Sequence, residues 1–245
     1  MKLITFCLLM LLSFEGIADC GLIKLHYNQR VPYVSATKNG IEGLTATPAA
    51  LAFKSSGIAF RWENTPFKRQ MKMIEDNEGC DCSVGRFKTA GREKLARFTH
   101  QIYQDKPQIA LARADNDKLQ NNVSVDSVLS NHQLKLEVKE GYSYGIVLDE
   151  KIARYQPNID RTTSENILSL KKVHLKRIDY FFIAQEEADG LIESSGIPKN
   201  DFKYIMFSDI TEGEKRYIMC SLKVSEETIE KLNQAIVENA SQNKP

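Results

Sequence analysis

The chain has 245 residues, and its 33 lysines and arginines almost balance 32 aspartates and glutamates, which leaves a formal net charge of +1 at pH 7. This balance offers no electrostatic basis for binding nucleic acid or an anionic membrane surface. After the N-terminal segment no stretch approaches the ~20 apolar residues that a membrane-spanning helix needs, so we do not expect an integral membrane protein.

The first 18 residues have the pattern of a secretory signal peptide. Lys2 supplies the positive start, residues 3–14 form an apolar core, and Gly16 and Ala18 supply small residues for cleavage. We therefore expect residues 1–18 to be removed and the mature chain to work in the periplasm. Cys20 raises lipid attachment as an alternative, which Asp19 disfavours because that signal normally has a small residue at this position.

Four cysteines remain after this segment: Cys20, Cys80, Cys82 and Cys220. An even number of cysteines in an oxidising compartment favours disulfides, and four cysteines allow three connectivities. A Cys-x-Cys pair together with histidines could also suggest a metal, but no two histidines lie at ligand spacing. We therefore expect disulfides, no metal site and no cofactor.

Strand and helix patterns alternate through the first part of the mature chain. Thr47 and Thr65 each stand before a proline, which is the pattern of a capping hydroxyl and a proline in the first turn of a helix. The expected order is strand 22–27, helix 47–57, strand 58–63, helix 67–76 and strand 80–84. This succession predicts an α/β protein with a parallel sheet covered by helices on both faces.

The pattern breaks before Pro107 and resumes as a second alternating region. We expect strands at 108–112, 133–138, 177–184, 202–207 and 216–222, helices at 123–131, 147–153, 164–173 and 186–194, and a last helix from residue 225. A glycine-bounded loop, residues 141–145, precedes helix 147–153. The chain after residue 18 is long enough for one large or two medium domains.

The most informative stretch is residues 80–99, where a strand ends at Gly85 and a loop leads to Thr89 and Arg92. Glycine lets the backbone approach a ligand closely, and a guanidinium that follows a hydroxyl by three residues can bind a planar anion with two hydrogen bonds. The alternatives are a salt bridge from Arg92 to Glu93, and a role for Thr89 as the cap of a helix over residues 90–98.

Further motifs lie upstream and downstream of this stretch in a fixed order. They are Pro32-Tyr33, Glu42-Gly43-Leu44, Arg177-Ile178-Asp179 before an apolar strand, and Arg216-Tyr217-Ile218-Met219-Cys220-Ser221 before the last helix. Together they cover nearly all of the mature chain. In this order the chain resembles the extracytoplasmic solute-binding proteins of family 3, which serve polar-amino-acid ABC transporters.

The resemblance implies a two-lobed α/β fold of the type II periplasmic-binding-protein kind, in which each lobe has a mixed, mostly parallel sheet flanked by helices. Two strands cross between the lobes of such proteins, so the first lobe is discontinuous. For this chain we expect lobe 1 to comprise residues 19–106 plus 216–245, and lobe 2 to comprise residues 107–215.

The resemblance also implies a function. A periplasmic solute-binding protein captures a small carboxylate-bearing ligand, an amino acid or a related compound, between its lobes and delivers it to an inner-membrane permease. We expect a monomer and not an enzyme. The alternatives are a ligand-sensing subunit for a signalling receptor and, less favoured, a cleft enzyme such as a dehydratase; no Ser-His-Asp arrangement or phosphate loop supports catalysis.

Ligand-binding residues are carried over from the family by position. Arg92 matches the arginine that pairs with the ligand carboxylate, and Thr89 matches a hydroxyl that assists it. Tyr33 lies where family members place an aromatic ring against the ligand, and Gly85 ends the strand before the loop. Phe87 lies where amino-acid binders often have a small or hydroxyl residue, so its ring would narrow the pocket or stack on the ligand. Ser143 and Tyr144 lie in the 141–145 loop, whose amides at a helix start could complete the carboxylate site; a plain turn is the alternative.

One position departs from the family pattern. Amino-acid binders carry an acid a few residues after the Arg-Ile-Asp element, where it pairs with the ligand ammonium, but here that position is Ala184. A slip of register would let Glu186 serve instead. A buried ammonium without a counter-charge is costly, so the sequence leaves the ligand open.

The family fold also suggests which cysteines pair. Its closing strand, here residues 216–222, runs antiparallel beside the third strand, and the first strand lies on the other side of the third. We expect Cys220 to pair with one of Cys80 or Cys82, and Cys20 to pair with the other.

Overall fold

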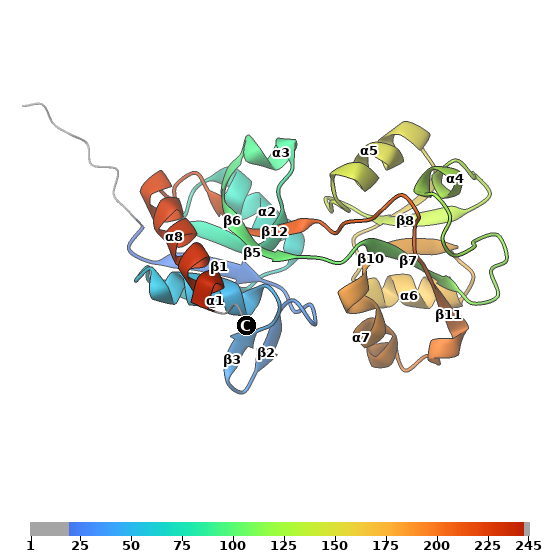
Figure 1. Cartoon of the computed structure of the whole chain (residues 1–245), viewed down its shortest axis with the longest axis horizontal. Coiled ribbons are helices and arrows are strands. Elements are labelled where there is room, and N and C mark those ends of the chain that lie inside the picture. Colours follow the sequence, from blue (N-terminus) through green and yellow to red (C-terminus); the bar gives the residue numbers. More distant parts are fainter. Residues whose placement is uncertain (1–19, 243–245) are drawn as a thin grey trace, which may run out of the picture.

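The computed structural model describes residues 20–242 and has two lobes, each built on a five-stranded sheet with helices on both faces (Figure 1). The expected signal peptide, residues 1–18, lies outside the described residues. Most elements fall where the sequence predicts them, with bounds that differ by a few residues. The structure thus confirms the two-lobed α/β fold.

The first lobe has the strand order β4-β1-β5-β12-β6. Its strands are β1 (Ile23–Tyr27), β4 (Phe60–Asn64), β5 (Asp81–Phe87), β6 (Ala96–Gln104) and β12 (Lys215–Ser221), and its helices are α1 (Ala46–Ser55), α2 (Phe67–Asp76), α3 (Ala90–Glu93) and α8 (Glu226–Gln242). Helices α1 and α8 bury their apolar stripes on one face of the sheet, and α2 covers the other. A hairpin of β2 (Ser35–Thr37) and β3 (Gly40–Glu42) projects from this lobe (Figure 1).

The second lobe has the strand order β11-β7-β10-β8-β9. Its strands are β7 (Gln108–Arg113), β8 (Lys135–Lys139), β9 (Asn158–Thr162), β10 (Tyr180–Ala184) and β11 (Phe202–Ile205), and its helices are α4 (Val125–Leu129), α5 (Ile146–Tyr155), α6 (Asn166–His174) and α7 (Gln185–Ser195), with a 3-10 turn at Lys199–Asp201. Helices α4 and α5 pack on one face and α6 and α7 on the other.

Each sheet is mixed rather than parallel throughout. Strands β4, β1 and β5 are parallel, whereas β12 runs antiparallel between β5 and β6. In the second sheet β7 is the strand that runs against its neighbours. Strands β7 and β12 are the two that enter each lobe from the other lobe, which explains why they oppose the strands joined by local crossovers.

The segment after Thr89 corrects one expectation. A helix over residues 90–98 was possible from the sequence, but α3 ends at Glu93 and β6 begins at Ala96. Phe98, Thr99 and Tyr103 favour an extended strand, and β12 supplies the partner that this edge strand needs. Strand β9 is also new relative to the sequence analysis, because its polar composition is typical of an exposed edge.

The four cysteines form two disulfides. Cys82 and Cys220 are register partners on β5 and β12, with their Cα atoms 4.0 Å apart. Cys20 precedes β1 and bonds to Cys80 just before β5, at a Cα separation of 5.9 Å. The structure therefore gives the expected partition of the cysteines and decides between Cys80 and Cys82, since β12 lies directly opposite Cys82.

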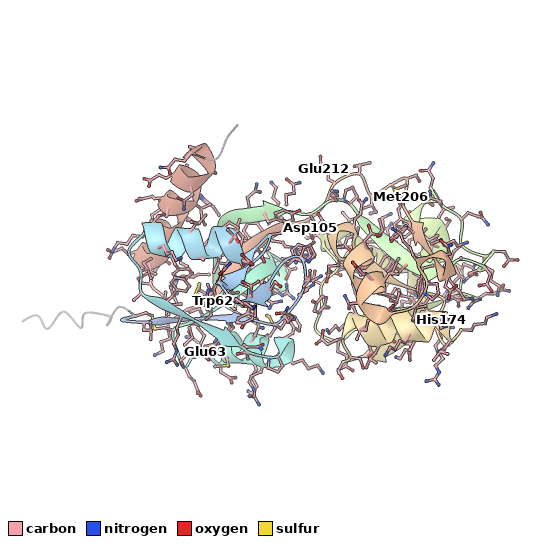
Figure 2. The ribbon with its side chains drawn as sticks, turned by 90° about the horizontal axis from the view of Figure 1, so that it is seen from below. Trp62, Glu63, Asp105, His174, Met206 and Glu212 are labelled. Atoms are coloured by element: carbon pink, nitrogen blue, oxygen red, sulfur yellow. A yellow bond between two sulfur atoms is a disulfide. The ribbon has the colours of Figure 1, made fainter. Side chains whose placement is uncertain are left out.

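Two segments connect the lobes, one between β6 and β7 and one between β11 and β12. They meet where the Asp105 amide donates a hydrogen bond to the Glu214 carbonyl at 3.0 Å. The Asp105 carboxylate, buried between the lobes (Figure 2), accepts two hydrogen bonds of 2.6 Å from the Arg216 guanidinium. This bidentate ion pair ties the first crossing to the start of β12.

Candidate functional site

A cavity lies between the lobes, where the carboxyl end of β5 faces β8, β10 and the loop before α5. Its volume is about 40 Å³, room for a few water molecules. Its lining includes Gly85, Phe87 and Arg92 from lobe 1, and Ser143, Tyr144 and Ala184 from lobe 2. Of the seven ligand-binding residues expected from the sequence, these walls bring together five; Tyr33 and Thr89 lie elsewhere.

A bulge at Gly85 shapes the lobe-1 wall. Along β12, Tyr217 and Met219 pair with Arg86 and Ser83 of β5, so β5 carries one extra residue. Gly85 adopts a φ of +72°, and a Cβ there would lie 3.0 Å from the Thr45 hydroxyl. The extra residue turns Arg86 to the same side of the strand as Ser83, although an uninterrupted strand would point them to opposite sides.

Arg86 is a buried cation with no acidic partner. Its side chain donates to the Ser83 hydroxyl at 2.5 Å and to the Gln70 carbonyl oxygen, and its guanidinium carbon lies 4.8 Å from the centre of the Phe67 ring. Among residues 20–242 no carboxylate pairs with it. Burial, together with neighbouring arginines, lowers the pKa of Arg86 to about 9. No sequence pattern points to this residue, because only the bulge turns it to the cavity wall.

Arg92 reaches across the cavity from one lobe to the other. Its Nη1 donates to the Phe87 carbonyl at 3.0 Å, and its Nη2 donates to the Gly141 carbonyl of lobe 2 at 3.4 Å. Burial lowers the pKa of Arg92 as well. The nearby Glu93 pairs instead with Lys88, at 2.9 Å. Within the described chain Arg92 therefore has hydrogen bonds to carbonyls but no carboxylate partner.

Thr89 and Tyr33 have supporting positions. The Thr89 hydroxyl accepts a hydrogen bond from the Arg92 amide at 3.4 Å and so caps α3. Tyr33 is only 2% exposed and lies beneath the cavity, with its hydroxyl 3.0 Å from Asp105 and its ring 4.0 Å from the Arg216 guanidinium carbon. Both residues hold arginines in place without lining the cavity.

Ser143 and Tyr144 line the cavity, but the amide donors at the start of α5 are already engaged. The Tyr144 amide donates to Asp149 at 2.8 Å, and the Ser143 hydroxyl donates to the same carboxylate at 2.5 Å. The Ile146 amide donates to Glu214 at 2.9 Å. Because carboxylates of the protein occupy this helix start, the loop offers few amide donors to a ligand in this conformation.

The acidic residue in the cavity wall is at neither of the two positions that the sequence suggested, residue 184 and Glu186. Ala184 is buried in the wall, and Glu186 turns to the crossing, where it accepts from the Lys106 amide at 2.7 Å. Glu187 pairs with Arg30. The acid in the wall is Glu137 of β8, which is 1% exposed and sits beside Phe181 of β10.

The charges around the cavity are unbalanced. Arg30 pairs with Glu187, Arg216 pairs with Asp105, and Lys139 pairs with Glu165 at 2.8 Å. Arg86 and Arg92 make no such pair. Arg86 is buried and Arg92 is half-buried, and neither has an ion-pair partner among residues 20–242, although the charge of Asp149, which Ser143 and Tyr144 hold, acts on Arg92. An anionic group beside them would offset the cost of burying these charges.

Neither a metal site nor a membrane span is found in the described part of the chain. In residues 20–242 no three histidine, cysteine or acidic side chains gather in a way that would hold a metal ion. His26, the buried histidine of β1, is held by Asp81 at 2.8 Å and by the Thr65 hydroxyl at 2.9 Å. No described helix is both long and apolar enough to cross a membrane.

Comparisons with known proteins support the fold. No protein-family model matches the chain, and no curated protein is similar in sequence. Among solved structures, an ancestral arginine-binding protein bound to arginine is 16% identical, with 90% of this chain and 93% of that chain covered and a TM-score of 0.70. The arginine-, lysine-, histidine-binding protein ArtJ from Geobacillus stearothermophilus is 12% identical, with 90% of each chain covered and a TM-score of 0.70.

A third similar structure comes from a study of glutathione import via GshT and the cystine ABC importer of Streptococcus mutans. It is 12% identical, with 91% of this chain and 90% of that chain covered and a TM-score of 0.73. All three descriptions concern binding or import of solutes rather than catalysis. At these identities the likeness shows the two-lobed fold of solute-binding proteins over nearly the whole described chain.

Proposed function

We propose that this chain is a periplasmic solute-binding protein that closes its two lobes on a small carboxylate-bearing ligand and delivers it to an ABC transporter. The observation that carries the proposal is the position of Arg92. Its guanidinium lies in the cavity between the lobes, makes no ion pair with a carboxylate of residues 20–242 and contacts Gly141 of the opposite lobe. A ligand carboxylate bound there would touch both lobes.

The proposed mechanism is a shift between open and closed lobes. The cavity of about 40 Å³ is too small for an amino acid, so entry requires the lobes to move apart. Contacts that a ligand makes with both lobes exist only after closure, and they therefore favour the closed form, which the transporter recognises. The fold of the similar structures and the two disulfides, which suit an oxidising compartment, support this function and location.

The proposal is tested by removing the guanidinium that it requires. A thermal-shift screen of carboxylates and amino acids should identify a stabilising ligand, and calorimetry should give its affinity. We expect Arg92→Ala to lose about 2–5 kcal/mol of binding free energy, because a charge-assisted contact in a closed cleft is removed. The exposed Arg61→Ala on β4 is the matched control and should bind like the wild type. Binding by Arg92→Ala within a few-fold of the wild type would contradict the assigned anchor.

A further inference from the structure

We infer that the ligand is an amino acid with a second carboxylate, and that Arg86 receives the second carboxylate while Glu137 receives the amino group. The inference rests on the proposed function and concerns the same cavity. It follows from three features of the walls: two unpaired cations, one unpartnered buried acceptor, and the net charge that they leave for a ligand to balance.

The first feature is that Arg86 is a separate receptor from Arg92. Arg86 is 6% exposed, and only its Nε and Nη2 donate to protein acceptors, so its Nη1 has no acceptor among the described residues. Arg92 is held by different partners, the carbonyls of Phe87 and Gly141. The two guanidinium groups repel each other in the cavity. Two anionic groups offset two such charges better than one does.

The second feature is the free oxygen of Glu137. Its Oε2 accepts from the Lys172 ammonium, but its Oε1 is buried without any partner in the described structure. Lys172 also pairs with Asp160 at 3.1 Å, so two carboxylates share one ammonium and the cluster keeps a negative charge. A buried acceptor without a donor is costly, and an ammonium group from a ligand would supply that donor.

The third feature is the charge of these groups taken together, and the position of Glu137 in the second sheet. The side chains of Arg86 and Arg92 contribute two positive charges, and the Glu137 cluster contributes one negative charge. The Asp149 carboxylate also acts on Arg92, but its oxygens accept from the Ser143 hydroxyl and the Tyr144 amide and it makes no ion pair with Arg92. A ligand with two carboxylates and one ammonium complements all three groups and carries one negative charge. Glu137, one strand away from Ala184 in the second sheet, thus supplies the acid that is missing at residue 184.

Calorimetry with four probes of similar size tests the inference. L-glutamate and L-aspartate carry all three groups, L-glutamine lacks the second carboxylate, and glutarate lacks the amine. We expect the two acidic amino acids to bind at least tenfold more tightly than L-glutamine and glutarate.

Two variants assign the groups. Arg86→Met should reduce the preference for L-glutamate over L-glutamine to within a few-fold, and Glu137→Gln should do the same for the preference over glutarate. The exposed Arg61→Met is the control and should keep both preferences. Thermal unfolding of each variant, followed before titration, shows that it is folded.

The results distinguish a failure of this inference from a failure of the proposed function. If L-glutamine binds as tightly as L-glutamate, one carboxylate is shared by both arginines and the inference is wrong, while the proposed function stands. The same holds if a broader carboxylate screen finds a ligand outside this class. If no small solute binds in that broader screen, the proposed function itself fails.

Discussion

At the scale of single residues, the cavity combines charges that a stable core would not keep. Arg86 lies between Phe67, Ser83 and Gln70, no carboxylate in the described part of the chain pairs with it, and burial lowers its pKa to about 9. That value is still above neutral pH, so the side chain is a cation in the folded protein. Binding sites commonly hold such groups because a ligand completes them.

We expect Arg86→Met to stabilise the ligand-free protein by about 1–3 kcal/mol, because it removes a desolvated charge and keeps most of the side-chain volume. Gln70 keeps a donor, since the Ser83 hydroxyl lies 2.6 Å from its carbonyl oxygen. Urea unfolding without ligand measures the change, and the exposed Arg61→Met should shift stability by less than about 0.5 kcal/mol. A loss of stability in Arg86→Met would show that its hydrogen bonds outweigh the buried charge.

Glu214 provides a test by pH. Its carboxylate accepts from the Ile146 amide, and burial raises its pKa above the usual 4.5, so the folded state binds the proton more tightly than the unfolded chain. The charged form therefore costs stability above the folded-state pKa, and this cost disappears as the pH falls below about 4.5.

We expect Glu214→Gln, which keeps the acceptor oxygen, to be more stable than the wild type at pH 7 and equally stable at pH 4. The difference should stay below about 1 kcal/mol, because the side chain is partly exposed. Urea unfolding at both pH values measures it. A difference that grows on acidification would contradict the direction of the pKa shift.

At the scale of elements, strand β12 comes late in the chain but lies inside the sheet of lobe 1. It lies between β5 and β6, and the Cys82–Cys220 disulfide links it to β5 across 138 residues of sequence. The Cys20–Cys80 disulfide closes 60 residues and links the segment before β1 to the residue that precedes β5. A cross-link that closes a longer loop restricts the unfolded chain more.

We expect the double variant Cys82→Ala/Cys220→Ala to lose about 2–5 kcal/mol of unfolding free energy. Cys20→Ala/Cys80→Ala should lose less, because its loop is shorter and Cys20 precedes the first strand. Urea unfolding of both variants compares the losses, and the mass of the unreduced mature wild type should show no free thiol. The opposite ranking would mean that local packing, rather than loop length, decides the contribution.

At the scale of the whole molecule, direct contacts join the lobes across the cavity. The Arg30 guanidinium of lobe 1 binds the Glu187 carboxylate of lobe 2 with two hydrogen bonds, and the pair is largely buried. The ring centroids of Phe67 in lobe 1 and Tyr142 in lobe 2 lie 4.8 Å apart. These contacts join the two lobes that Figure 1 shows side by side and oppose their separation.

We expect Glu187→Gln to shift the ligand-free protein toward open lobes, because it leaves the Arg30 charge without its partner, a change worth about 3–5 kcal/mol when both groups are buried. Small-angle scattering without ligand should show a larger radius of gyration. Lys68→Met removes the exposed pair with Glu140 and should change the radius little, since such pairs contribute about 0–1 kcal/mol. Equal radii for all three proteins would show that the Arg30–Glu187 pair does not hold the lobes closed.

Local patterns in the sequence were sufficient for the order of most strands and helices and for the α/β class. These features depend on residues close together in the chain, such as apolar periodicity and the Thr-Pro pairs near the helix starts. The partition of the cysteines, the assignment of Arg92 and the missing acid at Ala184 came instead from the order of motifs that resembles family 3, because they depend on segments far apart in the chain.

The tertiary structure alone decided the remaining features. Strand β6 forms because β12, more than 100 residues later, pairs with it, and Arg86 faces the cavity because the bulge opposite Tyr217 turns it there. Glu137 lies on β8, whose sequence has no motif that indicates a binding site. Its Oε1 atom has no partner among the described residues, because Lys172 of α6 binds only the Oε2 atom. Such features depend on pairing between distant segments, and local propensity carries no information about the partner or the face that it selects.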